Sequence, residues 1–117
     1  MKLIEVAQQL DLALLTPETP AIAAADITRG YASDLLSDVL AHAPEGGLLV
    51  TLQVHLNVIA VASHAELAAV VFAGGRRPGA DVIAKAAAED IVLYMAADET
   101  FDVVGRLYEL GVKGSHA

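Results

Sequence analysis

Short runs of apolar residues alternate with amphipathic segments along most of this chain. Nearly continuous apolar runs are typical of strands that are covered on both faces of a sheet. Such runs occupy residues 12–16, 48–52, 67–73 and 91–95, and residues 27–32 form a further short strand that Gly30 interrupts. Elsewhere apolar residues recur at helical spacing and predict amphipathic helices. These helices span residues 2–10, 34–43, 57–64, 78–89 and 100–110.

Parts of this pattern allow more than one interpretation. Residues 58–62 are apolar enough to form a strand by themselves, although Asn57 before them would cap a helix. Residues 21–25 are ambiguous, and an irregular segment is one interpretation. Ser33 is expected to cap the helix at 34–43, with Asp34 in its first turn. The last helix is expected to end at Gly111 and to bury Phe101, Val104, Leu107, Tyr108 and Leu110.

The order of the elements predicts the fold class. From residue 27 onward, strands alternate with helices, which indicates an α/β fold. We expect a mostly parallel sheet with right-handed crossovers and helices on both faces. The chain of 117 residues has the size of one domain. This domain is expected to span residues 1–111, and residues 112–117 are expected to form a disordered tail.

The composition predicts an apolar surface in addition to the core. The apolar fraction of 56% exceeds that of ordinary globular domains. No apolar run is long enough to cross a bilayer, and we see no signal peptide. The apolar excess is therefore expected to cover both faces of the sheet and to bury one further face in a partner, which favours a homodimer or another protein partner. The chain has no cysteine, which fits a cytoplasmic protein.

The charge excludes one class of partner. The formal net charge is −8, and the seven Lys and Arg residues form no run. Nucleic-acid binding requires a basic surface, so we do not expect it. The placement of the few basic residues is informative, because Arg29, Arg76 and Arg77 all lie beside glycines in predicted turns.

One of these turns is a candidate anion site. Gly74, Gly75 and Arg76 follow a predicted strand and precede a predicted helix. Glycines let backbone N–H groups approach a ligand closely, and a helix start adds partial positive charge. Arg76 would add a bidentate fork for a phosphate or carboxylate. The alternative is a turn that only reverses the chain, with solvated arginines.

A second candidate follows the strand at 48–52. Gln53, His55 and Asn57 alternate there, so they would share one side of an extended segment. Beside the glycine turn they would contact the polar edge of a base or another small ligand. The alternative is local, with Asn57 capping a helix, His55 partly buried and hydrogen-bonded, and Gln53 closing a turn.

Motifs for several kinds of catalysis are missing. The segment at 74–79 lacks the lysine and the hydroxyl of a Walker A motif, which argues against a kinase. The four histidines lack metal-ligand spacing, so we expect no metal site and no cofactor. The Ser33–Asp34 pair has no placed histidine, and helix capping explains it better than a triad. A small enzyme that uses His55 or an unpaired carboxylate as acid–base is the weakest hypothesis.

Four segments of the chain resemble one known family. They are residues 27–40 (ITRGYASDLLSDVL), 51–62 (TLQVHLNVIAVA), 71–78 (VFAGGRRP), and 100–101 (TF) with 106–111 (RLYELG). This pattern resembles the DRTGG domain family, in order and along nearly the whole chain. The resemblance implies an α/β fold like the N-terminal domain of HPr kinase/phosphorylase. It also implies a regulatory or dimer-forming role, without catalysis.

The name-giving turn departs from the family pattern. It reads Thr28-Arg29-Gly30, with arginine in place of the first of two glycines. The arginine would be strained if this turn needs a positive φ.

Two hypotheses about function follow. The first is a non-catalytic regulatory module that forms a homodimer and senses a small anionic, nucleotide-like ligand. Its site would combine residues 53–57 with residues 74–76, and Thr28 and Arg29 would close it. The second is a purely structural partner domain of a larger assembly, with no ligand.

Overall fold

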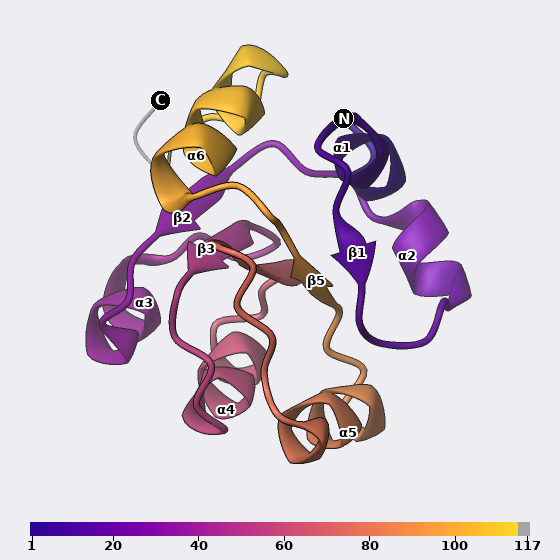
Figure 1. The fold of residues 1–117 in the computed structure, drawn as a ribbon, viewed down its shortest axis with the longest axis vertical. Coiled ribbons are helices and arrows are strands. Elements are labelled where there is room, and N and C mark those ends of the chain that lie inside the picture. The colour runs from indigo at the N-terminus through magenta and orange to yellow at the C-terminus, as the bar shows by residue number, and fades with distance from the viewer. Residues whose placement is uncertain (115–117) are drawn as a thin grey trace.

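Three of the apolar runs and the short strand predicted at residues 27–32 form parallel strands in one five-stranded sheet. In the computed structural model, which describes residues 1–114, the sheet order is β1-β5-β4-β3-β2 (Figure 1). The parallel strands are β2 (Gly30–Ala32), β3 (Leu48–Thr51), β4 (Ala69–Phe72) and β5 (Leu93–Met95). The fifth, β1 (Ala13–Leu14), pairs antiparallel with β5. The predicted mostly parallel sheet is therefore confirmed.

Helices cover both faces of this sheet. On one face lie α3 (Leu36–His42), α4 (Asn57–His64) and α5 (Ala80–Ala88) (Figure 1). On the other lie α1 (Leu3–Gln9), α2 (Pro20–Ala24) and α6 (Thr100–Glu109). Among these helices, which lie within residues 1–114, none combines the length and the hydrophobicity that a bilayer crossing requires.

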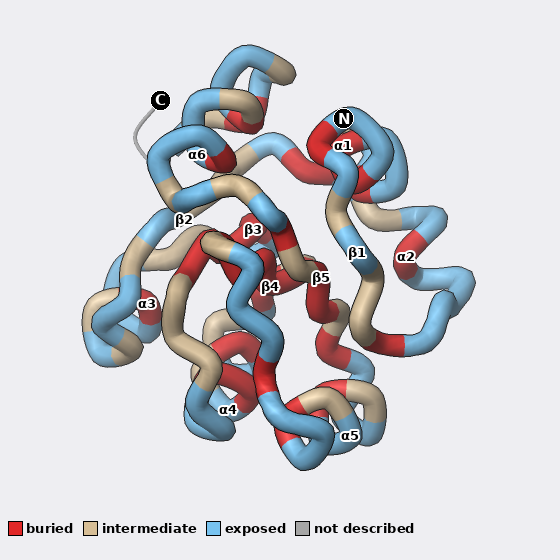
Figure 2. The backbone as a smooth tube through the Cα atoms, in the orientation of Figure 1, coloured by how far each residue is buried: buried red, intermediate tan, exposed pale blue. Residues whose placement is uncertain are grey.

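The buried side chains form two layers, one on each face of the sheet. Strands β3 and β4 are buried along their whole length (Figure 2). Successive side chains of a strand point to opposite faces. Leu48 and Val50 therefore pack under α1 and α6, whereas Leu49 packs against α3, α4 and α5. This explains why the runs read as continuously apolar rather than alternating.

Some local predictions need correction. The ambiguous segment at 21–25 lies mostly in α2, which begins at Pro20 because a proline is compatible with the first helical position. The helix interpretation of residues 57–64 is confirmed, but Asn57 is its first helical residue and does not cap it. In α3, the first helical residue is Leu36, so Asp34 precedes the helix.

The last helix buries a different face from the one predicted. Val103 and Leu107 are buried against the sheet, as Figure 2 shows for two segments of α6, whereas Phe101 is 88% exposed and Tyr108 is 54% exposed. The predicted face was therefore wrong in part. The sequence of α6 contains two overlapping apolar stripes, and packing against the sheet selects the one that includes Val103.

The C-terminal boundary also differs from the prediction. Val112 is buried, and Lys113 exchanges backbone hydrogen bonds with Thr28 and Gly30, so the fold continues to residue 113. Residues 115–117 of the predicted tail lie outside the described residues.

Candidate functional site

The turns that follow β3, β4 and β5 meet at the carboxyl edge of the sheet. Ligands of open α/β sheets bind at this edge. The backbone N–H of Ala73 donates to the carbonyl of Thr51 at 3.0 Å, and that of Gly74 donates to the carbonyl of Asp98 at 2.7 Å. The three turns are thus joined by backbone hydrogen bonds. The edge contains the predicted residues 53–57 and 74–76.

The glycine turn does not present the predicted backbone cradle. Gly74 and Gly75 both adopt positive φ, at 69° and 66°. However, the N–H groups of Gly74, Gly75 and Arg76 already donate to carbonyl oxygens of the chain. A ligand would therefore meet no free N–H at these three positions. The expected backbone contribution of this turn to anion binding is contradicted by the structure.

The N-terminus of the helix after this turn does not supply the partial positive charge that was expected to attract an anion. The first helical residue of α5 is Ala80, four residues beyond Arg76. The carboxylate of Asp81 lies close to the helix start, because a Cβ at Gly79 would be 2.6 Å from its Oδ1. A carboxylate at a helix N-terminus interacts favourably with the helix dipole and competes with a ligand anion.

The side chain of Arg76 is the cation that the glycine turn presents at the edge. Its Nε donates to the carbonyl of Leu52 at 2.7 Å, which links the β4 turn to the end of β3. The residue is exposed. With Nε fixed, the two terminal amino groups of the guanidinium are the donors that a phosphate or carboxylate would engage in bidentate fashion. Arg76 therefore lies at the edge of the sheet where the sequence predicted it.

The polar residues after β3 are used mainly inside their own turn. Gln53 Oε1 accepts from the N–H of His55 at 3.2 Å, and His55 Nδ1 accepts from the N–H of Asn57 at 3.1 Å. An accepting Nδ1 places the proton of the neutral ring on Nε2. The local interpretation therefore describes Gln53 and His55 better than direct ligand contact. Asn57 is the first residue of α4, and its exposed side chain lies at the same edge.

Asp34 also lies at the carboxyl edge of the sheet, although the sequence did not predict it as part of the candidate site. Its Oδ1 accepts from Thr51 Oγ1 at 3.1 Å and from the N–H of Leu52 at 2.7 Å. Asp34 thus connects the end of β2 with the end of β3. The available signal was its position directly after a strand, which had been attributed to helix capping instead. The predicted Ser33 cap is also wrong, because Ser33 Oγ accepts from the N–H of Leu35, which precedes the first helical residue, and α3 has no side-chain cap.

Thr28 and Arg29 lie at the opposite edge of the sheet. They precede β2, whereas Gly74–Arg76 follow β4, and β2 to β5 run parallel. The expectation that these two residues close the site is therefore wrong on geometric grounds. Arg29 instead forms an isolated bridge with Lys113. Its φ is not positive, so arginine at this position, where the DRTGG pattern has glycine, causes no backbone strain.

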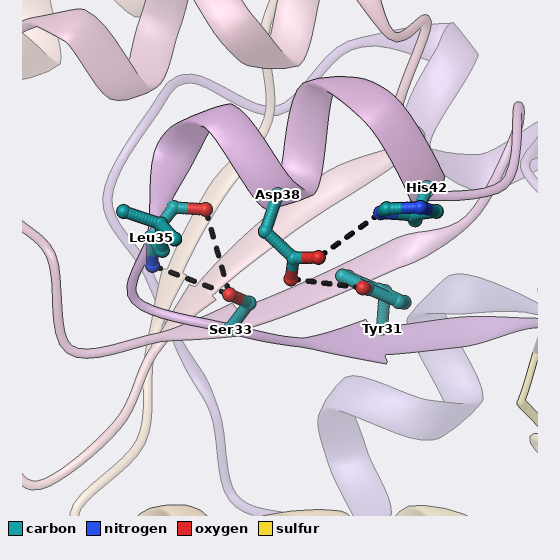
Figure 3. A network of polar contacts seen from close by, with 5 residues as sticks. All are labelled: Tyr31, Ser33, Leu35, Asp38 and His42. Carbon is teal, nitrogen blue, oxygen red and sulfur yellow. Dashed lines mark hydrogen bonds and ion pairs between the residues drawn. The ribbon is translucent and has the colours of Figure 1, made fainter.

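Polar contacts join Tyr31 of β2 to Asp38 and His42 of α3 (Figure 3). The Tyr31 hydroxyl donates to Asp38 Oδ2 at 2.8 Å, and His42 Nδ1 lies 3.0 Å from Asp38 Oδ1. Hydrogen bonds from Tyr31, then Ser33, lower the pKa of the Asp38 carboxyl, and the His42 ring adds to this. The same bond raises the pKa of Tyr31. Among residues 1–114, the contact of the His42 ring is the Asp38 carboxylate and no serine hydroxyl bonds to it, so this arrangement is not a nucleophilic triad.

Comparison with known proteins gives one informative likeness. No protein-family model matches this chain, and no curated protein matches it. A solved structure of the CBS and DRTGG domains of the regulatory region of Clostridium perfringens pyrophosphatase, complexed with the activator diadenosine tetraphosphate, is similar. Its TM-score is 0.73 at 11% sequence identity. The fold is shared with part of that regulatory region.

The similarity to the pyrophosphatase structure covers different shares of the two chains. It covers 91% of this chain and 45% of the pyrophosphatase chain, so this chain spans about half the length of its structural neighbour. It agrees with the α/β architecture described above and with the resemblance to DRTGG domains in the sequence. At this identity it shows the fold alone.

Proposed function

We propose that this chain is a regulatory module of DRTGG type that forms a homodimer, binds a small anionic, nucleotide-like ligand and does not catalyse a reaction. The observation that carries the proposal is Arg76, fixed through Nε to the end of β3 at the carboxyl edge of the sheet. The shared fold supports it, because the neighbour is a regulatory region in complex with a nucleotide activator.

The geometry favours recognition by side chains. The N–H groups of the glycine turn are bonded internally, so the affinity must come from the guanidinium of Arg76 with help from Asn57 and Arg77. An arginine binds phosphate through two parallel charge-assisted hydrogen bonds. The absence of catalysis is supported by the local use of Gln53 and His55, whose side chains accept backbone N–H groups of their own turn.

A ligand screen with two matched variants tests the proposal. The thermal midpoint is measured with AMP, ATP, diadenosine tetraphosphate and inorganic phosphate, because a ligand that binds only the folded state raises it. Arg76→Ala removes the anchored guanidinium, and Arg77→Ala removes an exposed neighbour that makes no described hydrogen bond. For the stabilising anion, Arg76→Ala is expected to raise Kd by about tenfold or more, the loss of one charge-assisted contact. Arg77→Ala is expected to raise it less.

Two results contradict the ligand proposal. One is the absence of stabilisation by any of these anions at millimolar concentration. The other is an equal effect of both arginine variants on Kd, because a nonspecific attraction to positive charge would produce it.

A purely structural partner domain is the second candidate. The exposed aromatic side chains of Phe101 and Tyr108 favour it, since large exposed apolar side chains that cluster on one surface mark interaction sites. The two candidates separate experimentally, because a structural partner domain of a larger assembly binds no ligand and its thermal midpoint does not respond to any anion. A homodimer is part of the first proposal and is compatible with the second.

A further inference from the structure

A cavity opens between α1, α2 and β1, at the β1 end of the sheet (Figure 1). Its volume of about 460 Å³ falls in the range of small-molecule sites. Leu14 and Tyr94 line it from the sheet, and because they lie directly opposite each other in β1 and β5 they share one face. Ile4 and Ile22 line it from the two helices. None of the residues of the candidate anion site contributes to this lining.

The hydroxyl of Tyr94 has no partner in the described part of the chain. The residue is only 3% exposed, and its hydroxyl makes no hydrogen bond within residues 1–114. A buried tyrosine hydroxyl ordinarily finds a partner. This hydroxyl is not sealed inside the core, so it opens into the cavity that Tyr94 lines. The cavity is therefore the place where a partner can reach it.

The charged residues that line the cavity are both acidic. Asp11 precedes β1 and Glu18 follows it, and within residues 1–114 neither carboxylate makes a hydrogen bond or an ion pair. The guanidinium of Arg106 contacts the end of α1 through the carbonyl of Gln9, but it is paired with Asp98. The described chain thus leaves the negative charge of this cavity unneutralised.

The charge of Glu18 reaches the tyrosine hydroxyl. Burial raises the pKa of Tyr94, and the carboxylate of Glu18 raises it further. We propose that this cavity binds a small aliphatic amine, with its ammonium group between the Glu18 carboxylate and the Tyr94 hydroxyl and its alkyl chain against Leu14 and Ile22. An ammonium group carries three N–H donors and no acceptor, and both of these oxygens accept hydrogen bonds. This site is separate from the anion site of the proposed function.

The lining favours an organic cation over the other classes of ligand. A metal ion requires several oxygen or nitrogen ligands, and residues 1–114 contain no group of three or more His, Asp or Glu that could hold one. The apolar side chains from both helices and from the sheet give an alkyl chain a surface to cover, which a bare ion would not use. An anion would be repelled by the two carboxylates.

Pentylamine, pentanol and pentanoate test the ligand class, because they share one alkyl chain and differ in charge. Each is titrated into the protein while backbone amide signals are followed by NMR. Pentylamine is expected to shift the signals of Leu14 and Tyr94 and to saturate at millimolar concentration. Pentanol and pentanoate are expected to bind at least about tenfold more weakly, because neither supplies the ammonium group. Pentanol that binds as tightly as pentylamine overturns the role of charge, and a spectrum unchanged by pentylamine overturns the site while leaving the anion site standing.

Three variants test the two contacts. Glu18→Gln is expected to raise the Kd of pentylamine about tenfold, whereas Glu5→Gln, the same change at an exposed residue of α1 outside the cavity, is expected to leave it within about twofold. Tyr94→Phe is expected to raise the Kd about fivefold without lowering Tm, because the hydroxyl that it removes has no partner within residues 1–114. Equal effects of the two glutamate variants would show a general attraction to an acidic protein and overturn the site. A Tyr94→Phe variant that binds as the wild type does, or that loses stability, overturns the role of the hydroxyl.

Discussion

Thr51 is the residue whose removal should most directly disturb the carboxyl edge. It is 0% exposed, and its hydroxyl donates to Asp34 Oδ1 at 3.1 Å and accepts from the N–H of Gln53 at 3.0 Å. Thr51→Val keeps the shape of the side chain and removes both hydrogen bonds. Two of the turns that form the candidate site depend on this one hydroxyl.

The expected cost follows from the environment of each partner. A hydrogen bond to a carboxylate contributes about 1.5 kcal/mol at the low end of its range, which applies because Asp34 is exposed and water can replace the hydroxyl. The N–H of Gln53 loses about 1 kcal/mol. The additional buried methyl group of valine returns about 0.8 kcal/mol. Thr51→Val is therefore expected to lower the free energy of unfolding by about 1.5–2 kcal/mol, or Tm by about 6–8 °C.

A double-mutant cycle with Asp34→Ala isolates the contact. Urea unfolding is measured for the wild type, both single variants and the double variant. In the Asp34→Ala background, Thr51→Val should cost less than about 0.5 kcal/mol, because only the Gln53 contact and the methyl gain remain. The expected coupling energy is thus about 1.5 kcal/mol, from the charge-assisted bond. Additive single-variant effects would refute the assignment of this contact to stability.

Two further predictions concern other parts of the fold. Gly47→Ala is expected to lower the free energy of unfolding by about 1–3 kcal/mol in urea titration, because its Cβ would lie 2.7 Å from the carbonyl oxygen of Pro44; a neutral effect would contradict this. The hydrogen bond from Tyr31 lowers the folded-state pKa of Asp38, so its contribution is complete above the ordinary value of 3.8 and is lost as the pH falls through the folded-state pKa. The Tm difference between wild type and Asp38→Asn should therefore be largest near neutral pH and shrink below pH 3.8; a constant difference would count against this linkage.

The candidate site was only partly predictable from the sequence. The positions of Arg76 and Asn57 after parallel strands placed them correctly at one edge, because the carboxyl ends of parallel strands meet. Whether the N–H of Gly74 is free for a ligand was not predictable, since it donates to the carbonyl of Asp98, which is distant in the sequence. The role of Asp34 was missed for the same reason, because its acceptor function is directed across the sheet to Thr51.

From residue 27 onward, the sequence by itself determined the order of strands and helices and the parallel sheet, because runs such as 48–52 and 67–73 can be satisfied only by burial on both faces. Tertiary structure decided which face of α6 is buried, because Val103 and Val104 are equally apolar and only packing over β3 distinguishes them. It also decided that Arg29 lies at the opposite edge from Arg76. Both arginines flank glycines in turns, and a local pattern does not contain the strand direction that separates them in space.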